Sequence, residues 1–133
     1  MDFPEEDFFE FIDRLQNEYK SVIIVEGAKD KEALKFWEIT YPIEILSPPL
    51  LEFSEGIMAK YTKEHQIILL LDADPEGKKF HNFLKNEFRK FGFRVNSGYW
   101  IKIQRYKVTY IEGLNSSKFQ ELKMKYSQIK IEK

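Results

Sequence analysis

The feature that most constrains the fold is an apolar segment that ends in two acidic residues. Residues 66–71 read QIILLL, and Asp72 and Asp74 follow them. An uninterrupted run of Ile and Leu is typical of a strand that is buried on both faces, as in a parallel sheet. The sequence that comes next, PEGKKFHNFLKNEFRKFG, has apolar residues at helical spacing and ends at Gly92. The segment therefore predicts a strand, a turn and a helix.

The same succession occurs earlier in the chain. Residues 22–25 form a β-branched run, Gly27 follows, and the next residues are helix formers with Leu34 and Trp37 on one face. Shorter apolar segments predict two further strands, at 42–47 and 93–96. Alternation of buried strands with amphipathic helices predicts the α/β class: an open, Rossmann-like sheet of about four mainly parallel strands, with helices on both faces.

Both ends of the chain predict helices. Residues 1–20 contain an acidic first turn followed by phenylalanines at helical spacing, so we expect an N-terminal helix packed on the core. The phenylalanines are numerous enough that some could meet a second subunit, which leaves a homodimer or other protein partners open. Residues 107–114, KVTYIEGL, predict a last strand, and residues 114–133 a basic helix or tail.

Composition narrows the class of protein. With 43% hydrophobic and 32% charged residues, the 133-residue chain is typical of a single globular domain. A net charge of −1 means that any nucleic-acid surface must be a local patch, and the absence of cysteine excludes disulfides and thiolate zinc sites. The acidic start differs from a signal peptide and no apolar run is long enough to span a bilayer, so we expect a cytoplasmic protein without a membrane partner.

Carboxylates follow two of the predicted strands. Glu26 ends the first strand, and Asp72 and Asp74 come after the third. In open parallel sheets the functional crevice lies beyond the carboxyl ends of the strands, so the three side chains should converge there. Alternation along an extended segment would point both aspartates the same way, past the small Ala73. Such a group of oxygen donors predicts a site for Mg²⁺, or for Mn²⁺ in its place.

A simpler interpretation exists for each aspartate, because an Asp after a strand is often the N-cap of the next helix. The combination with Glu26 favours a metal site, since desolvating three acids without a cation would be costly. Gly27 and Gly77 follow the acids, where the backbone must turn tightly or approach a phosphate closely. Four cations are candidates for contacts with nucleic acid: Lys29, Lys78, Lys79 and, in a basic and aromatic segment, Arg105.

The two acidic segments together resemble the Toprim domain, which topoisomerases, bacterial-type primases and several nucleases share. The family pattern is a strand that ends in Glu and Gly, then a later strand that ends in D-x-D with a Gly shortly after. Here these positions are Glu26 and Gly27, then Asp72 and Asp74, with Gly77 after them. The resemblance covers residues 21–113 and implies the Toprim fold.

The resemblance also implies roles for the acids: Glu26 as a general acid or base, and Asp72 and Asp74 as Mg²⁺ ligands. The chain has no room for the additional domains of topoisomerases, and it lacks the cysteines of the primase zinc module. Lys78 stands where the topoisomerase-like pattern has Glu, so details of that metal site do not carry over. The chain is most similar to small stand-alone Toprim proteins, related to the ribonucleases that mature 5S ribosomal RNA.

Two functions follow as hypotheses. The favoured one is a Mg²⁺-dependent nuclease that acts on nucleic-acid phosphodiesters, with RNA favoured over DNA. The alternative is a non-catalytic module that binds RNA or DNA as a subunit of a larger processing assembly. A third class, enzymes that handle small phosphorylated molecules, is less favoured because the sequence has no Walker-type or dinucleotide-binding glycine-rich loop.

Overall fold

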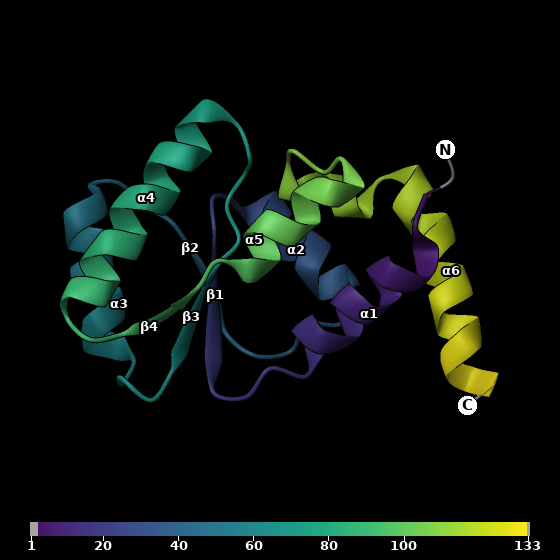
Figure 1. Ribbon diagram of the computed structural model, residues 1–133, viewed down its shortest axis with the longest axis horizontal. Helices are drawn as coiled ribbons and strands as arrows, with labels where there is room; N and C mark the ends of the chain where they lie inside the picture. Colours follow the sequence, from purple (N-terminus) through teal and green to yellow (C-terminus); the bar gives the residue numbers. More distant parts are fainter. Residues whose placement is uncertain (1–2, 133) are drawn as a thin grey trace.

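Helices and short strands alternate along the chain in the computed structural model, which describes residues 3–132 (Figure 1). No helix within these residues is both long enough and apolar enough to cross a membrane. The elements, in which η marks a 3-10 helix, are α1 (Glu5–Gln16), β1 (Ser21–Val25), α2 (Ala28–Phe36), β2 (Ile43–Ile45), α3 (Leu50–Lys60), β3 (Gln66–Leu69), α4 (Pro75–Lys90), β4 (Arg94–Asn96), α5 (Gly98–Ile103), η1 (Gln104–Tyr106), η2 (Ile111–Asn115) and α6 (Ser117–Glu132).

The four strands form one parallel sheet in the order β2-β1-β3-β4. Ile23 in β1 pairs with Ile43 of β2 on one side and with Ile68 of β3 on the other. The chain moves to one side of β1 for β2 and to the other side for β3, so the strand order reverses between β1 and β3. The predicted α/β class with an open parallel sheet is confirmed, and this reversal is where such sheets place their ligands.

After their first residues, the two central strands β1 and β3 are apolar, because helices cover both faces of the sheet (Figure 1). Val22 and Ile24 point into a core shared with α3 and α4. Ile23 and Val25, which point the other way, enter a larger core with α1, α2, α5 and α6. Every residue of β1 is buried, as the continuous β-branched run predicts.

The N-terminal helix belongs to the larger core. Phe8, Phe9 and Phe11 of α1 are all buried within this one chain, so these side chains do not require a second subunit to cover them. Phe8 lies edge-on to Trp37 at 5.3 Å between ring centroids. The last helix joins the same core through Phe119, Leu122 and Tyr126, the inward face expected from their spacing.

The prediction of a last strand at 107–114 is wrong. Within the described residues this segment pairs with no strand; it forms a loop followed by η2. Its backbone groups instead bond to the loop after β3: the Ala73 amide donates to the Thr109 carbonyl at 2.7 Å, and the Ile111 amide donates to the Asp72 carboxylate at 2.9 Å. Contacts distant in sequence thus override a local pattern of β-branched and aromatic residues.

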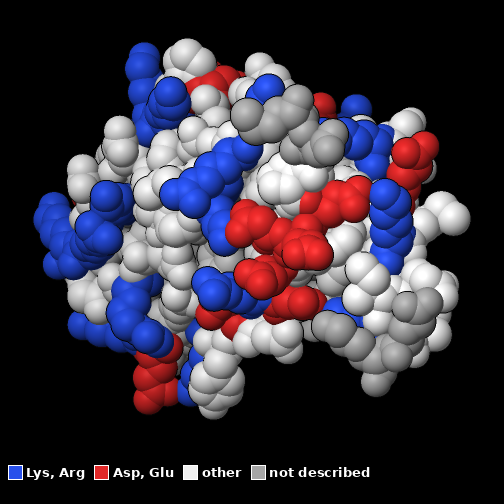
Figure 2. Space-filling view, turned by 45° about the vertical axis from the view of Figure 1, so that its right-hand side comes forward, with Lys and Arg blue, Asp and Glu red and all other residues white. Residues whose placement is uncertain are grey.

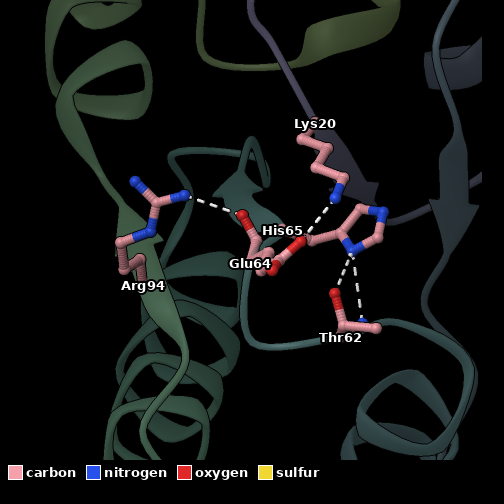
Figure 3. A network of polar contacts seen from close by, with 5 residues as sticks. All are labelled: Lys20, Thr62, Glu64, His65 and Arg94. Atoms are coloured by element: carbon pink, nitrogen blue, oxygen red, sulfur yellow. Dashed lines mark hydrogen bonds and ion pairs between the residues drawn. The ribbon is translucent and has the colours of Figure 1, made fainter.

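Polar contacts tie together the amino ends of three strands, at the edge of the sheet opposite Glu26 and Asp72. Figure 3 shows Lys20, which precedes β1, paired with Glu64, whose carbonyl also accepts a hydrogen bond from Arg94 at the start of β4. Beside them the His65 ring bonds to Thr62 through its Nδ1 atom, at 3.0 Å from the hydroxyl oxygen. These contacts pair His65 with a neighbour in the loop before β3.

Candidate functional site

Acidic side chains line a hollow at the carboxyl ends of β1 and β3. Glu26 directly follows β1, and Asp72 lies in the loop that leaves β3. The pairing of Ile24 with Leu69 puts the two strand ends side by side, so both carboxylates reach the same place. The hollow has a volume of about 340 Å³ and is named the acidic hollow below; its lining includes Glu26, Lys29, Asp30, Asp72, Tyr110 and Glu112.

Glu26 is the most perturbed of these acids. Its Oε2 atom accepts a hydrogen bond from the Asp72 amide at 2.7 Å. Burial raises the pKa of Glu26 to about 7, and the negative charges of Asp72, Asp74 and Asp30 act in the same direction, whereas the amide bond opposes them. A carboxyl group with this pKa can take up or release a proton near neutral pH.

Asp72 connects the loop after β3 to η2. Its Oδ1 atom accepts from the Ile111 amide, one of the unsatisfied donors at the start of that short helix. Burial raises the pKa of Asp72, the Ile111 bond lowers it, and the charges of Asp74 and Glu112 raise it again. The carboxylate therefore has a structural partner within the chain as well as a place in the lining of the acidic hollow.

Asp74 is the N-cap of α4. Its Oδ1 atom accepts from the Gly77 amide at 2.7 Å, and Pro75 takes the first helical position, where proline fits best. Its charge still reaches Glu26, whose pKa it helps to raise. The helix-cap interpretation thus describes the position of Asp74, and within residues 3–132 no group of three or more His, Asp or Glu side chains is arranged to hold a metal ion.

Asp30 is buried at the start of α2, with 5% of its surface exposed. It accepts a hydrogen bond from the Gly27 amide at 2.9 Å, which fits its expected place in the first turn of a helix. Burial raises its pKa, the charge of Asp72 raises it further, and bonds from the Gly27 and Glu112 amides lower it. Asp30 and Asp72 together hold the first amides of η2.

The two glycines of the motif have different surroundings. A methyl group on Gly77 would lie 2.0 Å from the Asp72 carbonyl oxygen and 3.0 Å from Oε2 of Glu26, so the first turn of α4 packs directly on the acidic loop. Gly27 has an extended backbone, with φ of −148° and ψ of 172°, and a methyl group there would meet nothing closer than 3.8 Å. Packing therefore requires a glycine at 77, whereas the fold alone would accept another residue at 27.

The predicted nucleic-acid contacts do not all lie together. Lys29 lines the acidic hollow, whereas Lys78 and Lys79 are exposed on the first turns of α4 outside its lining. Arg105 lies in η1, near Asp7, whose pKa is lowered first by a hydrogen bond from Tyr106 and also by the charges of Lys102 and Arg105. Of the four cations, the structure places Lys29 among the acids and Arg105 beside α1.

The surface around α1 is of mixed charge rather than basic. Figure 2 shows one face of the molecule, on which acidic side chains gather in a patch with lysines and arginines around it. Lysines of α5 and α6 are paired with acids of α1, in the pairs Lys102–Asp7, Lys125–Glu5 and Lys130–Asp13. Two lysines of the C-terminal segment, Lys125 and Lys130, are thus paired with acids of α1 at the surface.

The sequence does not predict Tyr110 and Glu112 as site residues. Both line the acidic hollow, and both are exposed. They belong to the segment that the sequence assigns to a strand, where neither would reach the carboxyl ends of β1 and β3. No pattern of residue types in the sequence indicates that they belong to the site. They lie at the acidic hollow because Asp72 and Asp30 accept hydrogen bonds from amides of this segment.

A larger hollow of about 550 Å³ lies between α1 and α5 and includes Glu18, Tyr99 and Lys102 in its lining. Three of its charged or polar groups are used within the chain, because the Tyr99 hydroxyl donates to Glu18 and Lys102 pairs with Asp7. The acidic hollow is smaller, but its charges are not balanced in this way. Chemistry that depends on unbalanced charge therefore fits the acidic hollow better.

Comparison with known proteins adds a structural relative. No family model matches the sequence, and no curated protein matches it. A solved structure of an Aquifex aeolicus protein is similar to this one, with a TM-score of 0.66 and 27% sequence identity. The match covers 77% of this chain and 94% of the solved chain.

The packing of Gly77 gives a stability prediction. Gly77→Ala should lower the free energy of unfolding by about 3 kcal/mol, because the new methyl group overlaps the Asp72 carbonyl and must displace α4 or the acidic loop. Urea denaturation followed by circular dichroism measures the change. Gly56→Ala is the control: Gly56 is exposed in α3 with nothing near the added methyl group, so this variant should gain about 0.5–1 kcal/mol from helix propensity. Equal stability of Gly77→Ala and wild type would contradict the close packing.

The raised pKa of Glu26 gives a pH prediction for the metal-free protein. The folded state binds this proton more tightly than the unfolded chain, so its contribution to stability is lost as pH rises from about 4.5 to about 7. Glu26→Gln keeps an acceptor for the Asp72 amide and removes the ionisation. In chelator, the variant should match wild type below this range and exceed it at pH 8 by about 1 kcal/mol, a value reduced for solvent screening of a partly exposed group. A wild-type advantage that grows with pH would show that Glu26 is stabilised as the anion.

Proposed function

We propose that the protein is a cytoplasmic, Mg²⁺-dependent nuclease of the small stand-alone Toprim type, which cleaves phosphodiesters in nucleic acid, with RNA favoured over DNA. One observation carries the proposal. Glu26 lies at the carboxyl ends of adjacent parallel strands, where burial and then the repulsion from Asp72 and Asp74 raise its pKa to about 7. A divalent cation would relieve this repulsion, and a hard cation suits carboxylate oxygens.

The donor set fits Mg²⁺, or Mn²⁺ in its place. Magnesium is commonly held by one or two carboxylates, with waters and substrate phosphates completing its shell. Glu26 and Asp72 both line the acidic hollow, and Asp74 contributes charge from the start of α4. When bound, the cation would supply charge stabilisation to a phosphoryl group.

The chain's own residues would then position the phosphodiester and move protons. In hydrolysis a water oxygen bonds to phosphorus as the bridging P–O bond breaks, the water loses a proton and the departing oxygen gains one. Glu26 suits one of these transfers, as general base or general acid, because its pKa lies near neutral pH. Lys29, exposed in the lining of the acidic hollow, is placed to meet a flanking phosphate.

A second candidate is a non-catalytic module that binds RNA or DNA within a larger processing assembly. A specific observation favours it: each of the three acids already accepts a hydrogen bond from a backbone amide, those of Asp72, Ile111 and Gly77. These bonds give the acids a role in the fold that does not depend on catalysis. The two candidates share a binding site and differ in whether the phosphodiester is cleaved.

The test of both candidates is a cleavage and binding assay. The protein is incubated with labelled single-stranded and structured RNA and DNA, in Mg²⁺, in Mn²⁺ or in chelator. We expect metal-dependent cleavage, lost by at least about a hundredfold in Glu26→Gln and in Asp72→Asn, because each removes one charge from the acidic hollow. Lys63→Gln, which changes an exposed charge remote from the acidic hollow, serves as the control.

Three outcomes separate the candidates. Cleavage that survives both substitutions would exclude these acids as its source. Intact substrate that is still bound would establish the non-catalytic module. Absence of both cleavage and binding, with and without metal, would exclude the two candidates together.

Gly27 gives a separate test of phosphate approach. Because its conformation and surroundings accept a methyl group, Gly27→Ala should change the free energy of unfolding by no more than about 0.5 kcal/mol. If a phosphate lies against this backbone, the same variant should weaken nucleic-acid binding several-fold in Mg²⁺. Gly113→Ala, which also has open space around the added methyl group, is the matched control. Unchanged binding by Gly27→Ala would remove Gly27 from the phosphate site.

A further inference from the structure

Tyr110 presents an aromatic ring at the edge of the acidic hollow. Its residue surface is 52% exposed, and it lines the same hollow as Glu26, Lys29 and Asp72. A ring of this size left half open to water beside a cluster of charges lacks the burial that explains most aromatic residues. Its position therefore needs another explanation.

Most of the other tyrosines differ from Tyr110 because their hydroxyl groups have partners within the fold. Five of the seven tyrosines donate their hydroxyl groups to acceptors within the fold, namely Tyr41, Tyr61, Tyr99, Tyr106 and Tyr126. Tyr110 is not one of them, and the aromatic contacts among residues 3–132 do not include its ring. Tyr19, which is 81% exposed, lies just before β1 at the opposite edge of the sheet.

The backbone on either side of Tyr110 is fixed to the site. The carbonyl of Thr109 accepts from the Ala73 amide at 2.7 Å, and the amide of Ile111 donates to Asp72 at 2.9 Å. Ile111 and Leu114 of η2 are buried, and the Trp37 indole donates to the Leu114 carbonyl at 2.8 Å. The ring is thus exposed while its attachment is rigid, which lowers the entropy lost when a ligand packs against it.

We infer that Tyr110 stacks on an unpaired base of the nucleic acid whose phosphate meets the acidic hollow, so the substrate class is single-stranded nucleic acid or an unpaired segment. The inference rests on the proposed function. Stacking on an aromatic ring is open to every base, but in a duplex the faces of the bases are already covered by their neighbours. A single strand presents both an unpaired base and a phosphate. The acidic hollow holds a partner for each, the ring of Tyr110 for the base and the cation of Lys29 for the phosphate.

The experiment measures binding of oligonucleotides that carry 2-aminopurine, whose fluorescence falls when the base stacks. Single-stranded RNA, single-stranded DNA and a duplex of the same sequence are titrated in Ca²⁺, a cation that carboxylate oxygens also bind. Tyr110→Ala should bind both single strands about tenfold more weakly than wild type and lose the quenching, whereas Tyr110→Phe should keep both. Tyr19→Ala, the exposed tyrosine at the other edge, should behave as wild type.

The outcomes distinguish this inference from the function on which it rests. Unchanged single-strand affinity and quenching in Tyr110→Ala, with binding lost in Asp72→Asn, would overturn the stacking role and leave the metal site standing. Tighter wild-type binding to the duplex than to either single strand would also overturn it. If wild type binds none of the oligonucleotides, with or without the cation, the proposed function fails and the stacking role fails with it.

Discussion

The pairing of β1 with β3 is the interaction on which the rest of the structure depends. These two strands are the middle of the sheet, and their side chains supply both hydrophobic cores. Because they are parallel and in register, Glu26 and Asp72 leave the sheet at the same edge. The burial that stabilises the strands and the repulsion between the acids are therefore two results of one pairing. A shift of one residue in its register would turn every side chain of the strand toward the opposite core.

Much of this arrangement can be predicted from the sequence, because it depends on patterns of residues that are close together in the chain. The runs at 22–25 and 66–71 identify strands covered on both faces, and the spacing after each identifies a helix. Convergence of Glu26 and Asp72 follows from parallel pairing. The conformation of the segment around Tyr110 cannot be predicted in this way, since its β-branched and aromatic residues are typical of strands. Its course is set by hydrogen bonds to Ala73 and Asp72, nearly forty residues away, which no local pattern encodes.

The three acids have two roles: they accept hydrogen bonds from the backbone, and they give the acidic hollow its charge. Their geometry allows both roles at once. A carboxylate has two oxygens, and the bonds of Glu26, Asp72 and Asp74 to the backbone each use one. The loop, the start of α4 and η2 are thus held by the same groups that give the acidic hollow its charge. Gly77 permits this close packing, because a larger residue would separate α4 from the loop that contains Asp72. For the same reason, the effect of a substitution at these acids on stability has to be known before its effect on activity can be interpreted.

The hydrogen bond from the Trp37 indole to the Leu114 carbonyl has a consequence for spectroscopy. Leu114 lies in η2, whose first amides are held by Asp72 and Asp30. The Trp37 indole is fully buried, and its hydrogen bond contacts the carboxyl end of the same short helix. A shift of the backbone that the acids anchor would reach this indole through the Leu114 carbonyl, so the fluorescence of Trp37, once separated from that of Trp100, offers an intrinsic probe of the acidic hollow that needs no added label.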